Sequence, residues 1–232
     1  MEEIYQGKAK TVYDAGEGIA VIEFRDDITA GDGAKKERKE GKGAINAEIS
    51  ARLLNLLEES GIKTHFIEFQ KPNRLVVRNV KIIPVEVILR NIATGSLVRR
   101  YPFKEGEVLD SPVVEFGYKS DEYHDPMLND EIALALNLCT GEELEYMRNE
   151  TRKINTVLKD FFLDRGIILV DFKLEFGRTA EGEIVLVDEI SPDTCRFWDK
   201  ETREIMDKDR FRRDMGDVLE FYNEVKRRVL SG

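Results

Sequence analysis

The segment from residue 171 to residue 176 constrains this chain most strongly, because charged and apolar side chains alternate along it. Its charged members are Asp171, Lys173 and Glu175, and its apolar members are Phe172, Leu174 and Phe176. Alternate side chains of a β-strand point to opposite faces of the sheet, so all three charges share one face. An apolar core does not accommodate such a face, and the segment is therefore a candidate functional surface.

A turn and a second strand follow, and they bring another carboxylate toward the charged face. Gly182 is the glycine expected of a tight turn, and residues 184–187 have the composition of a β-strand. If the turn centres on Glu181 and Gly182, Glu175 lies directly opposite Asp188. The Cβ atoms of such neighbours are about 4.5–5.5 Å apart, so the two carboxylates repel unless a proton or a cation lies between them.

Two interpretations of this carboxylate pair remain open from the residues alone. Proteins hold Mg²⁺ with one or two carboxylates plus substrate phosphates, so a metal site would explain the pair. A surface ion-pair network that includes Lys173 would neutralise the same charges.

Composition argues against several classes of protein. The 232 residues carry a net charge of −10, whereas sequence-independent binding to nucleic acid or to an anionic membrane requires a basic surface. No apolar run approaches the roughly 18 residues of a membrane span, and the acidic start does not resemble a signal peptide. We therefore expect a cytoplasmic protein. Cys139 and Cys195 are far apart and predict neither a zinc site nor a disulfide.

The first 24 residues predict a set of short strands with a tight turn at Gly7. The strand period of two places Lys8 and Lys10 on one face, beside a glycine that lets the backbone approach a ligand closely. Two ammonium groups there suit a polyphosphate, although the spacing of a P-loop is absent. A solvated surface strand is the more common explanation of such a pattern.

Residues 24–43 combine mixed charges with four glycines and predict a mobile loop, either a lid or a solvated connector. A helical period begins at Ala44 and ends near Gly61, and strands are expected at 66–69 and 75–80. The first half of the chain is thus expected to form an antiparallel lobe that carries one helix.

The segment 85–101 is a candidate anion site. A strand would place Glu86 and Arg90 on one face and lead into a short segment ending at Ser96. The Arg90 guanidinium, the Ser96 hydroxyl and exposed backbone N–H groups all donate to anions. A structural pair between Glu86 and Arg90 explains the same pattern.

The remaining segments predict scaffold. Residues 102–128 predict a long loop with one short strand at 113–116, and Thr140 with Glu143 forms a capping box before a long helix. Residues 167–170 predict a buried strand that leads into Asp171, and residues 208–230 predict one amphipathic helix. Cys195 has no base placed beside it, and we expect it to pack in the core.

Four segments together resemble one family, the phosphoribosylaminoimidazole-succinocarboxamide synthases or SAICAR synthetases of purine biosynthesis. The segments are residues 7–10, 86–96, 171–175 and 188–198, in order along the chain. The resemblance implies a two-lobed α+β fold. Its antiparallel N-terminal lobe, kinase-like or ATP-grasp-like, would span residues 1–83, and a larger α+β lobe would span residues 84–232. ATP would bind in the cleft between the lobes.

The resemblance also implies an activity. Such an enzyme is an ATP-dependent ligase that condenses a carboxyaminoimidazole ribonucleotide with L-aspartate through an acyl phosphate, giving SAICAR, ADP and phosphate. The implied partners are these small molecules and a second copy of the chain in a homodimer. The alternatives are another ATP-dependent carboxylate–amine ligase, a small-molecule kinase, or a non-enzymatic nucleotide-binding regulatory protein.

By the same resemblance, each candidate residue receives a role. Mg²⁺ would be held by Glu175 and Asp188. ATP would be bound by Gly7, Lys8, Lys10, Lys81, Ile82, Ile83 and Lys119. The other substrates would be bound by Arg90, Ser96, Arg196, Thr29, Gly31 and Asp32. The reacting groups would be positioned by Lys173, Asp193 and Lys10.

Overall fold

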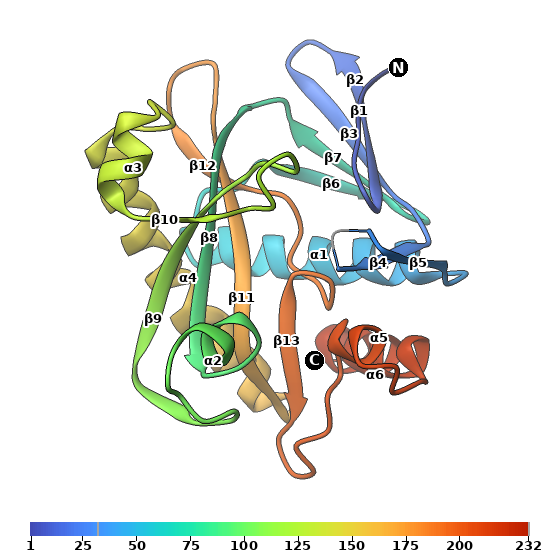
Figure 1. Ribbon diagram of the computed structural model, residues 1–232. Helices are drawn as coiled ribbons and strands as arrows, with labels where there is room; N and C mark the ends of the chain where they lie inside the picture. The colour runs from blue at the N-terminus through green and yellow to red at the C-terminus, as the bar shows by residue number, and fades with distance from the viewer. Residues whose placement is uncertain (32, 232) are drawn as a thin grey trace.

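The charged strand, β11, lies inside a six-stranded antiparallel sheet (Figure 1). The structure, a computed structural model, describes residues 1–31 and 33–231. The strand order is β10-β9-β8-β11-β12, and β13 pairs with the first half of β11. The bounds are β8 Lys81–Ile92, β9 Val108–Tyr118, β10 Met127–Leu128, β11 Ile167–Arg178, β12 Ile184–Val187 and β13 Cys195–Asp199.

A second, five-stranded antiparallel sheet is built from the first part of the chain, in the order β1-β2-β3-β7-β6. The bounds are β1 Glu2–Gln6, β2 Lys10–Gly16, β3 Ile19–Phe24, β6 Phe66–Gln70 and β7 Arg74–Arg78. This sheet ends at Arg78 and the six-stranded sheet begins at Lys81, so the backbone passes directly from one sheet to the other. The expected strand-rich first half of the chain is confirmed.

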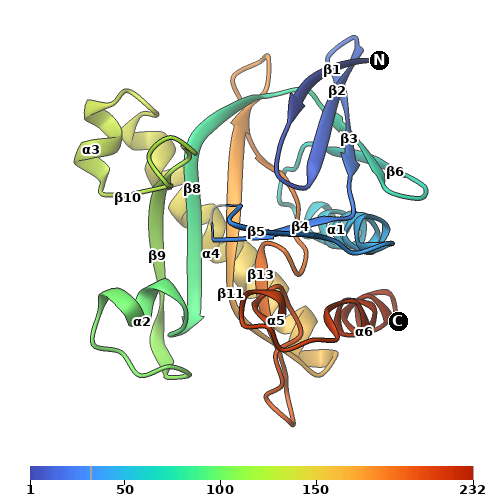
Figure 2. The same ribbon diagram turned by 45° about the vertical axis from the view of Figure 1, so that its right-hand side comes forward.

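Helices cover the sheets and join them. Helix α4 packs on β11, and α1 contacts both β6 of the first sheet and α6 near the C-terminus (Figure 2). The bounds are α1 Lys42–Glu59, α2 Ser96–Arg100, α3 Asp130–Ala135, α4 Gly141–Asp164, α5 Asp209–Arg212 and α6 Val218–Leu230. The predicted capping box at Thr140 and Glu143 is present at the start of α4. Among the described residues, no helix is long and apolar enough to cross a membrane.

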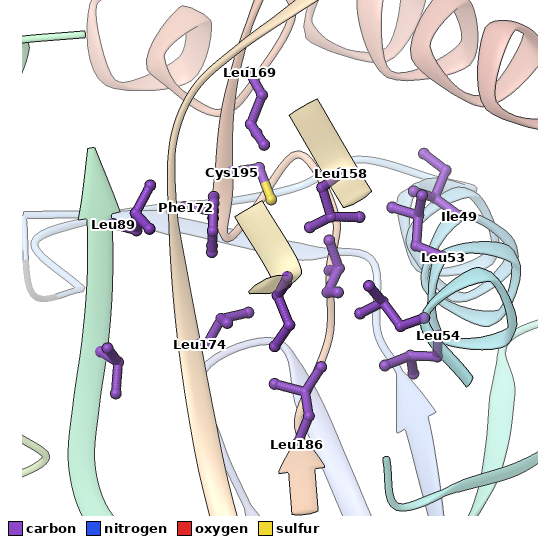
Figure 3. Close-up of a cluster of buried hydrophobic side chains, with 14 of the residues drawn as sticks. Ile49, Leu53, Leu54, Leu89, Leu158, Leu169, Phe172, Leu174, Leu186 and Cys195 are labelled. Atoms are coloured by element: carbon purple, nitrogen blue, oxygen red, sulfur yellow. The ribbon is translucent and has the colours of Figure 1, made fainter. Parts of the chain in front are cut away.

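The apolar side of β11 faces the main core. Phe172, Leu174 and Phe176 are each at most 1% exposed and pack with apolar residues of α1, α4 and β8. Figure 3 shows Cys195 among these side chains, close to Leu169 and Phe172. Cys195 is 4% exposed, and burial raises the pKa of its thiol. Its expected role in packing is confirmed.

Three local predictions were wrong. The segment 27–38, predicted as a mobile loop, forms the hairpin of β4 Asp27–Ala30 and β5 Lys35–Arg38, which Lys35 ties to the Phe211 carbonyl oxygen at 2.7 Å. The strand predicted at 113–116 extends over the whole of β9, because β8 offers a paired edge along its length. The single helix predicted at 208–230 breaks into α5 and α6, because Asp214, Gly216 and Asp217 all have positive φ.

Candidate functional site

The charged face of β11 is confirmed, and it is buried between charged partners from other strands. Asp171 and Glu175 are each 3% exposed, while Lys173 between them is partly exposed. A strand rises about 3.3 Å per residue, so Asp171 and Glu175 lie roughly 13 Å apart along β11. Two different groups of charges gather at these two positions.

A carboxylate–lysine cluster surrounds the Glu175 end of the strand. Lys173 Nζ lies 2.8 Å from Glu175 Oε1 and 2.7 Å from Glu86 Oε1 of β8. Lys119, which follows β9, pairs with the other oxygen of Glu175. The members of the cluster are Lys10, Glu86, Lys119, Lys173, Glu175, Asp188 and Glu189. Because these residues come from both sheets, the cluster lies where the sheets meet.

The predicted pairing of Glu175 with Asp188 is wrong by one residue. Glu175 pairs with Val187, because the connecting loop has five residues and centres on Glu181. Within it, the Thr179 N–H bonds the Glu183 carbonyl oxygen at 2.8 Å. Asp188 therefore lies just after β12, with a positive φ of 68°. It still belongs to the cluster, because Lys10 pairs with its carboxylate and its charge acts on Glu175.

Both carboxylates are ionised near neutral pH. Burial alone would raise the pKa of Asp188, but the positive charge of Lys10 and of two further lysines holds it well below its ordinary value. The pKa of Glu175 is likewise lowered, because Lys173 and Lys119 outweigh burial and the repulsion from Asp188. Two ionised carboxylates are suitable oxygen ligands for a hard divalent cation. The two carboxylates thus fit a divalent metal ion. In the absence of a metal ion, the neighbouring lysines neutralise their charge.

The glycine turn between β1 and β2 directs its two lysines to different partners, and only Lys10 reaches the cluster. The Gly7 N–H donates to the Lys10 carbonyl oxygen at 2.9 Å, which closes the predicted turn. Lys10 Nζ also lies 2.9 Å from Glu189 Oε1. Lys8, by contrast, is exposed and lies 2.8 Å from Asp121 in the loop after β9. The two ammonium groups therefore face different partners.

A guanidinium network surrounds the Asp171 end of β11. Arg90 is only 2% exposed, and its guanidinium donates to Asp171 at 3.0 Å, to Ser96 at 2.8 Å and to Glu115. The alternative pair between Arg90 and Glu86 does not form, because Glu115 of β9 and Asp171 of β11 flank Arg90 instead. The members of the network are Arg90, Ser96, Arg100, Glu115, Asp171, Arg196 and Asp209.

Arg196 is more accessible than Arg90, with 19% of its side chain exposed against 2%. Its Nη1 donates to Asp171 Oδ2 at 2.8 Å and its Nε donates to Asp209 Oδ2 at 2.8 Å. Burial would lower the pKa of Arg196, but Asp171 and Asp209 raise it, so the side chain stays charged. A cation fixed by two carboxylates in this way is a preorganised site for a phosphate or carboxylate.

Replacement of Arg196 by lysine should weaken binding of an anionic substrate selectively. One ammonium group cannot reproduce the two directed bonds to Asp171 and Asp209. Loss of one charge-assisted hydrogen bond costs about 1.5–3 kcal/mol, so we expect KM for the ribonucleotide that the family resemblance implies to rise about 10- to 100-fold, with KM for the implied ATP nearly unchanged. Steady-state kinetics of Arg196→Lys with each substrate varied separately measures this. An unchanged KM for the ribonucleotide with normal kcat would contradict the assignment.

Gly95 fits closely against Arg196. A Cβ atom added to Gly95 would lie 2.7 Å from Nη2 of Arg196, and Gly95 has a φ of 57°. We expect Gly95→Ala to displace the guanidinium and to lower kcat/KM for the implied ribonucleotide about 10- to 100-fold, because a misplacement of about 1 Å can have that effect. Gly18→Ala is the matched control, because Gly18 has a similar φ of 75° and open space around it. Equal kinetics for the two variants would contradict a contact effect.

A third group of polar side chains is centred on Asp193. Asp193 Oδ2 lies 2.6 Å from Nζ of Lys42, and the Tyr222 hydroxyl donates to Oδ1 at 2.8 Å. Burial would raise the pKa of Asp193, but the ammonium of Lys42 holds it well below its ordinary value. The three residues come from the start of α1, from the segment before β13 and from α6. Asp193 is thus held in place by one residue from the first part of the chain and one from the C-terminal helix.

The other predicted residues lie in several places. Thr29 is buried in β4, Gly31 is in the turn that follows, and Asp32 lies outside the described residues. Lys81, Ile82 and Ile83 begin β8, where Ile82 is 41% exposed and Ile83 is fully buried. Lys81 and Ile82 pair with Arg178 and Gly177 of β11.

Several members of these groups were missed from the sequence. Lys42 was assigned to a loop, although the glycines on either side of it, Gly41 and Gly43, indicate a site where the backbone packs closely. A Cβ atom on Gly43 would lie 2.3 Å from the Phe24 carbonyl oxygen, so this helix start packs tightly against β3. No local pattern marks the others as partners, because the folded chain brings them together. These residues are Glu115, Glu189, Asp209 and Tyr222.

The architecture is shared with solved enzyme structures. A structure described as SAICAR synthetase (Type-2) in complex with ADP matches with a TM-score of 0.96 and 49% identity, covering 98% of this chain and 97% of that one. The structure of SAICAR synthetase from Pyrococcus horikoshii OT3 matches with a TM-score of 0.92 and 48% identity, covering 95% and 97%. The fold is therefore an α+β fold with antiparallel sheets that ATP-dependent ligases of this type share.

The sequence comparisons agree with the structural ones. The model of the family described as SAICAR synthetase matches residues 3–229. The phosphoribosylaminoimidazole-succinocarboxamide synthase of Methanopyrus kandleri is 56% identical over 231 residues, 99% of this chain and 94% of that one. Its counterpart in Methanocaldococcus jannaschii is 55% identical over 228 residues, 98% and 94%. The chain belongs to the SAICAR synthetase family.

Proposed function

We propose that this chain is an ATP-dependent ligase that joins the carboxylate of a carboxyaminoimidazole ribonucleotide to the amine of L-aspartate, with release of SAICAR, ADP and phosphate. The observation that carries the proposal is the row of Asp171, Lys173 and Glu175 on β11. It runs from a guanidinium network to an ionised carboxylate–lysine cluster over roughly 13 Å. A substrate with a phosphate at one end and a reacting carboxylate at the other matches this row.

The nucleotide would bind between two lobes. We take residues 1–83 as a kinase-like or ATP-grasp-like lobe and residues 84–232 as the larger lobe. Lys10 from the first sheet and Lys119 from the second reach the same carboxylate–lysine cluster, which supports a phosphate site at the junction. The phosphates would be covered by Gly7, Lys8, Lys10 and Lys119, and the adenine would meet the backbone of Lys81, Ile82 and Ile83.

Mg²⁺ would be held by Glu175 and Asp188. When bound, the ion would offset the charge that develops on the transferred phosphoryl group. The described residues contain no cluster of three or more histidine, cysteine or acidic side chains arranged as a metal site, so phosphate and water oxygens would complete the coordination. Lys10 and Lys173, which now neutralise the carboxylates, would then be free to contact phosphate oxygens.

The ribonucleotide would bind at the other end of the row. Its phosphate and carboxylate would be contacted by Arg196 and Ser96. Arg90 would act mainly by orienting Ser96 and Asp171, because its own guanidinium is buried and each of its three nitrogens already donates to a side-chain oxygen. Lys173 and Asp193 would position the reacting groups, and the segment with Thr29, Gly31 and Asp32 would border the substrates.

The chemistry proceeds in two displacements. An oxygen of the substrate carboxylate attacks the γ-phosphorus of ATP, ADP leaves, and an acyl phosphate forms. The amine of L-aspartate then attacks the activated carbonyl carbon, phosphate leaves, and the nitrogen loses a proton as the amide forms. The lysines near β11 stabilise negative charge on the transferred group and on the leaving phosphate.

Phosphate release from purified protein tests the proposal. It should require ATP, Mg²⁺, the imidazole ribonucleotide and L-aspartate together, and SAICAR should form in equal amount. Phosphoryl transfer without aspartate would indicate a kinase, and ATP binding without turnover would indicate a regulatory protein. We further propose that the enzyme works as a cytoplasmic homodimer, and light scattering of the purified chain tests the dimer.

A further inference from the structure

His65 lies in the segment that ties the N-terminal sheet to the strand before Asp188. Its backbone N–H donates to the Leu186 carbonyl oxygen at 2.8 Å, and its own carbonyl oxygen accepts from the Arg78 N–H at 2.7 Å. The Leu186 N–H in turn donates to the Lys63 carbonyl oxygen at 2.9 Å. The position of β12, and of Asp188 after it, is therefore set by backbone bonds from the other sheet.

The side chain of His65 continues this support. It is buried, with 3% exposure, and it hydrogen-bonds to the backbone of Asp188. Its Nε2 atom has no partner in residues 1–31 and 33–231, so Nδ1 is the nitrogen that makes this bond. Burial lowers the pKa of His65 to about 4.

Asp188 has a backbone conformation that requires such support. Its φ of 68° lies in the left-handed region, which is strained for a residue other than glycine. Such a conformation persists only where surrounding contacts determine it. Within reach of Asp188, Lys10 fixes the carboxylate, and His65 is the side chain that bonds its backbone.

We propose that His65 is a positioning residue that holds the left-handed backbone of Asp188 and so aims its carboxylate at the metal–nucleotide site. This inference rests on the proposed role of Asp188 as a metal ligand. Groups that orient a ligand in this way typically change metal affinity or activity about 10- to 100-fold when they are removed. Residues 63–65 would thereby couple the N-terminal sheet to the metal end of β11.

A matched pair of substitutions tests the inference. In His65→Asn, the amide nitrogen occupies nearly the place of Nδ1, whereas in His65→Gln it lies nearer the place of Nε2. Calorimetric titration with ADP, with and without Mg²⁺, gives a readout that does not depend on turnover. We expect His65→Gln to lose about tenfold or more of the gain in ADP affinity that Mg²⁺ provides, and His65→Asn to keep it within about threefold. The Mg²⁺ dependence of turnover should shift in parallel, with KM for L-aspartate unchanged.

Two outcomes would overturn the inference. One is that both variants fold and bind Mg²⁺ with ADP as the native chain does, while Asp188→Asn has lost that binding. The other is that both variants lower the melting temperature equally with no change in the Mg²⁺ effect, which is the signature of packing alone. A native-like Mg²⁺ effect in Asp188→Asn itself would instead reject the proposed metal site, which separates the two failures.

Discussion

Asp188→Asn should lower kcat at least about 100-fold while leaving the fold intact. The substitution removes one charge at nearly constant volume, and an amide is a much poorer ligand for Mg²⁺ than a carboxylate. The fold should survive because Lys10 keeps a second carboxylate partner, Glu189, at 2.9 Å. Phosphate release at several Mg²⁺ concentrations, together with thermal unfolding, measures both parts of the expectation.

Asp160→Asn provides the control for this experiment. Asp160 is an exposed residue of α4, and its substitution removes the same charge from the chain without touching the carboxylate–lysine cluster. We expect its kinetics to equal those of the native chain. Turnover of Asp188→Asn near the native level at limiting Mg²⁺ would reject the metal assignment, and unfolding of that variant alone would reject the claim that Lys10 is still satisfied.

The alternation of residues along β11 was sufficient to predict its charged and apolar faces. Phe172 and Leu174 enter the core while Asp171 and Glu175 meet charged partners, because the period of a strand leaves no other choice. The hairpin register was less secure. The centre of a five-residue loop lies half a residue away from the centre of a four-residue loop. That small shift makes Val187, and not Asp188, the partner of Glu175.

The interaction partners of the site residues could not be predicted from the sequence. A pair of Arg90 with Glu86 on one strand face was one of two interpretations, but the sheet places Arg90 between Glu115 and Asp171 on two flanking strands. Asp193 meets Tyr222 and Lys42 only because α1 and α6 pack together. Contacts across elements depend on how the core is assembled, and local patterns carry little information about that.

The pair of Lys42 and Asp193 gives the largest stability effect that we expect. Both side chains are nearly completely buried, with exposures of 1% and 6%. Lys42→Met keeps the length of the side chain but leaves the carboxylate of Asp193 buried without its cation, which costs about 3–5 kcal/mol. For a chain of this size, we expect the melting temperature to fall by roughly 6–20 °C, as differential scanning calorimetry can measure.

Two controls separate this ion pair from a loss of packing. In the native chain the pKa of Asp193 is lowered, so its ionised carboxylate stabilises the fold at any pH above the ordinary pKa of an aspartate. That stability is lost as the pH falls through the lowered pKa. Without Lys42, burial raises the pKa of Asp193, so protonation in the folded state should make the deficit of Lys42→Met smaller at pH 5 than at pH 8. Adding Asp193→Asn should recover part of the deficit, because the uncompensated charge is gone and Tyr222 keeps a partner. A deficit independent of pH, with the double variant less stable than Lys42→Met, would show that Lys42 acts through packing and not through its charge.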